Sequence, residues 1–127
     1  SVSLAIADTA MRTKNFDDAF QAWDTLAKDT KDSLYVTAMV GKAESLSGQG
    51  KAAEALAALE SIALPEGSEA ANLVNSLMVS AAERAGDLKK ALALCEKLIP
   101  GMAERSPEEA EYWRQKAASL RMAAAQS

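Results

Sequence analysis

The chain has 127 residues, of which 49% are hydrophobic but only 5% aromatic, with a formal net charge of −4 and no histidine. This length suits a single domain with its own core, and a core of small aliphatic side chains favours packed helices over a sheet. The negative charge argues against binding to nucleic acid or to an anionic membrane surface. Without histidine, the chain lacks the commonest general base and metal ligand, so we expect no enzyme activity, no cofactor and no metal.

Two helices are predicted at the start of the chain. Residues 2–13 have a helical apolar period, and a second helix begins after Asn15, an N-cap residue followed by Asp17 and Asp18, which the helix dipole favours. The turn between them is short, so the helices are expected to be antiparallel neighbours. The expected buried faces are Val2, Ile6, Ala7 and Ala10 in the first helix, and Phe16, Ala19, Phe20, Trp23, Leu26 and Ala27 in the second.

A second pair of helices is predicted after the polar stretch 28–33. Asp32 or Ser33 is the expected N-cap of a helix over about 34–47, which Gly48 and Gly50 end. The fourth helix covers about 51–63. The expected core positions of the third helix are Leu34, Ala38, Met39, Ala43 and Leu46.

Three further helices are predicted after the break at 64–67. The fifth covers about 69–85, and the sixth follows the turn at Gly86 and runs to Ile99, where Pro100 and Gly101 are expected to end it. The sequence 106–109 then combines an N-cap serine, a proline and two acids, which predicts a helix over about 107–124. Its expected apolar stripe is Ala110, Trp113, Ala117, Leu120 and Ala124.

The stretch made of a turn and the helix that follows it occurs three times, with a constant step of 36 residues. A period of this size is typical of stacked repeats, in which each unit buries its apolar face against its neighbours. The aligned positions are Phe16, Ala52 and Leu88; Ala19, Ala55 and Ala91; Phe20, Leu56 and Leu92; Trp23, Leu59 and Cys95; and Leu26, Ile62 and Leu98. In this alignment Cys95 is expected to be a buried small side chain.

These residues resemble the tetratricopeptide repeat family, whose unit is a helix-turn-helix with two fixed small sites. The matching small sites are Ala7 and Ala19, Ala43 and Ala55, and Val79 and Ala91, and the turn glycines are Gly50 and Gly86. The chain departs from the family in its 36-residue step, in Lys14 at the first turn, and in the large Val79. The resemblance implies an all-α, right-handed α-solenoid over 1–127, with three hairpins (about 1–33, 34–67 and 68–101) and a capping helix (about 107–124).

The resemblance also implies a concave groove, formed by the first helix of each hairpin, that holds a peptide or a helix of a partner protein. The groove residues would be Leu4, Asp8, Met11, Arg12, Thr37, Val40, Glu44, Ser47, Leu73, Ser76, Ser80, Glu83 and Arg84. The lysines and asparagines with which chaperone-binding members of the family clamp a carboxylate are missing, so an apolar or basic segment is the expected ligand. The chain is thus predicted to be a non-catalytic interaction module or scaffold.

An alternative of another class is self-association of a larger, membrane-anchored envelope protein. Val2, Leu4 and Ile6 have no preceding helix to cover them, so the first helix would pair with a second copy or with an upstream segment. The start at Ser1, inside a helical pattern, favours a fragment or a processed form. Fold-level similarity to the soluble parts of bacterial envelope proteins favours a periplasmic or membrane-tethered location over a cytoplasmic one. No stretch here has the roughly 18 uncharged apolar residues that a membrane span needs, so direct membrane insertion is not expected.

Overall fold

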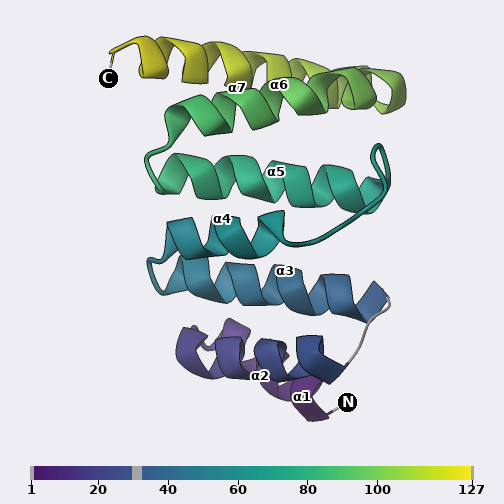
Figure 1. Cartoon of the computed structure of the whole chain (residues 1–127), viewed down its shortest axis with the longest axis vertical. Coiled ribbons are helices and arrows are strands. Elements are labelled where there is room, and N and C mark those ends of the chain that lie inside the picture. The colour runs from purple at the N-terminus through teal and green to yellow at the C-terminus, as the bar shows by residue number, and fades with distance from the viewer. Residues whose placement is uncertain (1, 30–32, 127) are drawn as a thin grey trace. The chain divides into compact units, whose positions relative to one another are not determined.

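The computed structural model describes residues 2–29 and 33–126, which form seven α-helices and no strand (Figure 1). The helices are α1 (Val2–Arg12), α2 (Phe16–Asp29), α3 (Ser33–Gly48), α4 (Ala52–Glu60), α5 (Glu69–Arg84), α6 (Leu88–Arg105) and α7 (Pro107–Gln126). The all-α class is therefore confirmed. Of the two predicted caps of the third helix, Asp32 lies outside the described residues, and α3 begins at Ser33.

The chain divides into two compact units, residues 1–63 and 64–127. In the first unit, α1 packs on α2, α2 on α3 and α3 on α4, and short turns join α1 to α2 and α3 to α4 (Figure 1). The core of this unit is rich in alanine, which allows helices to approach closely. Its buried hydrophobic residues are Ala7, Ala10, Ala19, Ala22, Trp23, Leu26, Ala27, Ala38, Met39, Ala43, Leu46, Ala55, Leu56, Leu59 and Ile62.

The second unit packs α6 against both α5 and α7. Ser106 joins α6 to α7: it is the C-cap of α6, and its hydroxyl accepts a hydrogen bond from the backbone N–H of Glu109 in the first turn of α7. A guanidinium nitrogen of Arg105 donates to the carbonyl of Gly67 at 3.0 Å, which ties the end of α6 to the loop before α5. The buried hydrophobic residues are Ala71, Val74, Met78, Val79, Ala81, Ala82, Ala91, Cys95, Leu98, Ala110, Ala117 and Leu120.

The turns inside the three hairpins have the same geometry. Lys14, Gly50 and Gly86 all have positive φ angles, of 60°, 80° and 83°. The residue after each of them donates its N–H to the carbonyl five residues earlier, at 2.8, 2.8 and 2.9 Å. This is the bond of a Schellman C-cap, which satisfies a free carbonyl at the helix end and favours glycine in the left-handed position. At the first turn Lys14 takes this conformation at a cost of about 1 kcal/mol.

Burial follows the same period as the turns. The first small site of each repeat, at 7, 43 and 79, is 0%, 2% and 1% exposed, and the second, at 19, 55 and 91, is 0% exposed throughout. Val79 fits the first site although it is larger than the alanines that precede it. The 36-residue repeat predicted from the sequence is thus a repeat of local structure in both units.

Two glycines of α3 lie directly against aromatic rings of α2. These contacts were not predicted from the sequence. A Cβ atom on Gly41 would overlap the indole ring of Trp23, and one on Gly48 would lie 2.5 Å from Cγ of Phe16. The missing side chains let α3 lie directly against these rings. Trp23 is buried, and its Nε1 has no hydrogen-bond partner in the described structure.

Pro100 lies inside α6, so the prediction that the sixth helix ends there is wrong. Proline removes one backbone hydrogen bond and costs about 3 kcal/mol inside a helix. The helix continues to Arg105 because its packing on α7 offsets this local cost. The fourth helix, in contrast, ends at Glu60, earlier than predicted.

The predicted core faces need one main correction, in α1. Val2 is 76% exposed and Ile6 is 51% exposed, whereas Ala7 and Ala10 are buried as expected. The reason is geometric: α1 has a neighbour over its Ala7 side, and Val2 and Ile6 project from another side of the helix. Five other predicted core residues are only half-buried, namely Phe16, Phe20, Leu34, Trp113 and Ala124.

Candidate interaction face

In the described residues, no group of three or more Cys, Asp or Glu side chains is arranged to hold a metal ion. Across the same part of the chain, each helix is too short or too polar to cross a membrane. Cys95 is fully buried, as predicted, and its thiol donates to the carbonyl of Trp113 at 3.2 Å. Desolvation raises the pKa of Cys95, so the thiol stays protonated near neutral pH and is a poor nucleophile.

One distinct surface feature is what we call the hairpin face, on the side of α1 and α2 that carries the exposed Ile6. Two neighbouring hollows lie on it, with volumes of about 460 and 350 Å³. The larger one is lined by Val2, Ala5, Ile6, Thr9, Ala10, Thr13, Asn15 and Asp18, and the smaller one by Ser3, Ile6, Asp18, Gln21, Ala22 and Thr25. Ile6 and Asp18 line both hollows and form the wall between them.

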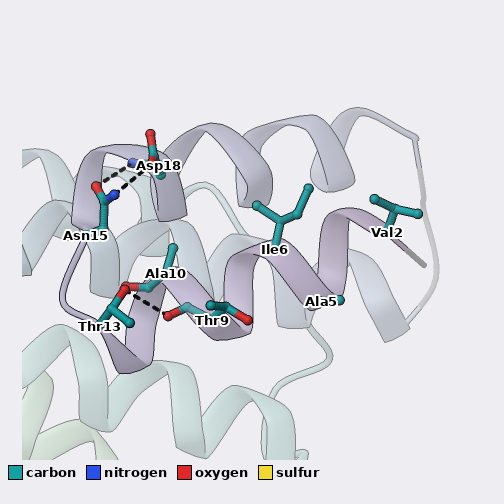
Figure 2. Close-up of a pocket in the computed structure, with 8 residues that line it drawn as sticks. All are labelled: Val2, Ala5, Ile6, Thr9, Ala10, Thr13, Asn15 and Asp18. Carbon is teal, nitrogen blue, oxygen red and sulfur yellow. Dashed lines mark hydrogen bonds between the residues drawn. The ribbon is translucent and has the colours of Figure 1, made fainter.

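The hairpin face is mostly apolar, and the hydroxyl groups of two residues that line it are satisfied within their own segments. Thr13 donates to the carbonyl of Thr9 at 3.0 Å, and Thr25 donates to the carbonyl of Gln21 at 2.9 Å. Val2 and Ile6 project from α1 on this side of the hairpin (Figure 2). A partner that covers the face therefore meets methyl groups and few polar groups in need of a partner.

Asp18 is held in place by Asn15 at the start of α2. The amide nitrogen of Asn15 donates to Oδ2 of Asp18 at 2.6 Å, and the backbone N–H of Asp18 points back to the Asn15 side-chain oxygen at 3.5 Å (Figure 2). This reciprocal arrangement is that of a helix N-cap. Among the described residues that line either hollow, Asp18 is the one with an ionisable side chain. Its neighbour Asp17 accepts instead from the Gln49 amide at 2.7 Å.

The predicted groove residues of the first unit lie on α1 and α3. The Ser45 hydroxyl lies 3.4 Å from the Met11 sulfur, which is a contact between α1 and α3. Desolvation raises the pKa of Glu44. The residue is exposed at the surface, but neighbouring groups partly shield its carboxylate from water. Four of the eight residues are half-buried, Leu4, Met11, Val40 and Ser47, and four are exposed, Asp8, Arg12, Thr37 and Glu44.

The predicted groove residues of the second unit lie on α5. Leu73 is 54% exposed, and the Ser76 hydroxyl donates to its carbonyl at 2.7 Å, while Ser80 and Arg84 are exposed. Glu83 is bound within the unit, because its carboxylate pairs with Lys116 of α7 at 2.9 Å. This contact raises the pKa of Lys116, and it was not predicted because the two residues are far apart in the chain.

None of the thirteen predicted groove residues lines the hollows of the hairpin face. The sequence did carry one signal for this face, since Val2 and Ile6 were among the residues expected to pair with a second copy or with an upstream segment. Leu4, the third residue of that signal, is half-buried.

Comparison of the chain with known protein families, with curated proteins and with solved structures found no match.

Proposed function

We propose that the chain is a non-catalytic protein-interaction module, which binds a segment of a partner protein on the hairpin face. One observation carries the proposal: Val2 and Ile6 are exposed apolar side chains beside two hollows in the same face. The fold does not need this exposure, because α1 is already anchored by the buried Ala7 and Ala10.

Energetics support a binding role for this face. Covering an exposed valine or isoleucine stabilises a complex by about 1.5–3 kcal/mol for each side chain. Exposed apolar residues that lie next to hollows are typical of sites where proteins bind one another. Val2 and Ile6 are one helical turn apart, so one partner segment can cover both.

The proposal includes a tetratricopeptide-like architecture, a right-handed solenoid of three hairpins with α7 as the cap. It is supported by the 36-residue period of small buried sites and by the three Schellman turns at the same spacing. Repeats of this kind act by presenting a preformed surface. The absence of histidine supports a function without catalysis.

The predicted groove face is a second candidate surface. It is favoured by the contact between Met11, a predicted groove residue of α1, and Ser45 of α3, the helix that carries the other predicted groove residues of the first unit. Self-association through the hairpin face is the third possibility, and its motivation is the same exposed pair, Val2 and Ile6.

Affinity capture from native extract, quantified by mass spectrometry, compares these surfaces. We expect the natural chain to enrich a partner that Ile6→Glu loses by at least about tenfold, because a charge would be buried in an apolar contact. Val40→Glu, a matched change on the groove face, should retain the partner.

Circular dichroism of both variants shows whether they remain folded, and the mass of the natural chain is measured against concentration. Loss of the partner with Val40→Glu alone would assign binding to the groove face. A dimer that Ile6→Glu dissociates would favour self-association. Either result would overturn the proposal.

A further inference from the structure

We infer that the segment bound by the hairpin face is an amphipathic helix with two apolar side chains on either side of a lysine or arginine. The apolar side chains enter the two hollows, and the cation meets Asp18 on the wall between them. This inference rests on the proposed function, and it adds the chemistry of the partner.

The backbone of the hairpin face explains why the partner is a helix. The described part of the chain is helical and offers no strand edge, so an extended segment would find no row of N–H and C=O groups to pair with. A segment bound to an apolar surface must still satisfy its own backbone polar groups. A helix does so internally and presents side chains to the surface.

The shape of the face fits such a helix. Two hollows share the wall formed by Ile6 and Asp18, so a rod that crosses the wall places one side chain in each hollow. Side chains three or four residues apart project from the same side of a helix. Two anchors about seven residues apart therefore share this side with a third side chain, three or four residues after the first anchor, which lies over the wall.

Charge complementarity decides which residue lies over the wall. Asp18 is the ionisable group among the described residues that line the hollows, and its described bonds are to Asn15. A partner that covers this carboxylate removes water from it, and an acidic or apolar residue at that point would leave the charge unpaired. A lysine or arginine pairs with it.

A phage-displayed library of 16-residue helical peptides with randomised surface positions tests this inference. The library is selected on the natural chain, and each enriched peptide is then tested on Ile6→Glu to identify those that use the hairpin face. We expect these peptides to share two apolar residues about seven apart, with a lysine or arginine three or four residues after the first of them.

The dissociation constant of the best such peptide, measured by fluorescence polarisation, then isolates the charge contact. Asp18→Asn should weaken binding about 3- to 10-fold and reduce its dependence on salt, because the amide keeps the shape and removes the charge. Asp29→Asn, which removes an exposed carboxylate of α2 outside the hollows, should leave the affinity within about twofold.

The outcomes separate the inference from the proposed function. Peptides that need Ile6 but carry neutral or acidic residues, or that bind Asp18→Asn as tightly as the natural chain, overturn the inference and leave the proposed function standing. A selection in which no peptide depends on Ile6 overturns both.

Discussion

Leu98→Ala is expected to lower the free energy of unfolding by about 2–5 kcal/mol, because it removes a fully packed side chain and leaves a cavity. Leu98 is 2% exposed and belongs to α6, which packs on both α5 and α7. It is also the third member of the repeat position occupied by Leu26 and Ile62, which are likewise buried. Urea denaturation followed by circular dichroism gives the change.

The control for this substitution lies two residues away in the same helix. Glu96 is exposed and makes one surface ion pair, with Arg121 at 3.2 Å, so Glu96→Ala should cost under about 0.5 kcal/mol. Equal losses in the two variants would show that the helical phase of α6 is different from that described.

Gly41→Ala is expected to lower the free energy of unfolding by about 1–3 kcal/mol, although alanine is ordinarily the better helix residue. The added methyl group would overlap the indole of Trp23, which is buried and cannot move aside. The same change at Gly101 of α6 meets nothing within 4 Å and should raise stability by about 0.5–1 kcal/mol.

The opposite signs at two helical glycines make this comparison decisive, and thermal or urea unfolding measures both. A third variant tests the cause: in a Trp23→Phe background, the smaller ring should make Gly41→Ala less costly than in the natural chain. A stabilising Gly41→Ala would mean that α2 and α3 do not approach each other at this point.

The repeat was predictable because it depends on local patterns. Small residues at 7, 43 and 79, and the turn positions 14, 50 and 86, recur at a step that can be counted in the sequence. Even Lys14, which departs from the glycine of the other turns, adopts their left-handed conformation. Helix existence and order therefore followed from periodicity and capping residues alone.

Features that depend on packing between helices were missed. Gly41 looks like an unfavourable residue in a helix until Trp23, eighteen residues earlier in the chain, is placed against it. Pro100 looks like a helix end, and only the packing of α6 on α7 shows why the helix continues. The hairpin face could be predicted only in part from the sequence, because the exposure of Ile6 depends on which side of α1 its neighbours cover.

The candidate groove rests on the family resemblance, and it remains a prediction. In the first unit, Met11 of α1 contacts Ser45 of α3. In the second unit, Glu83 pairs with Lys116, a contact that was not predicted from the sequence. The hairpin face, in contrast, is defined by hollows and by exposed apolar side chains that belong to one unit.

Hydrogen–deuterium exchange of the natural chain, with and without its captured partner, locates the working surface most directly. We expect amide exchange to slow by about tenfold or more in residues 2–13 and 16–25, because a bound segment restricts the opening of α1 and α2. Exchange in α3 and α5 should change little. Protection in α3 and α5 without protection in α1 would contradict binding at the hairpin face and would assign the partner to the groove.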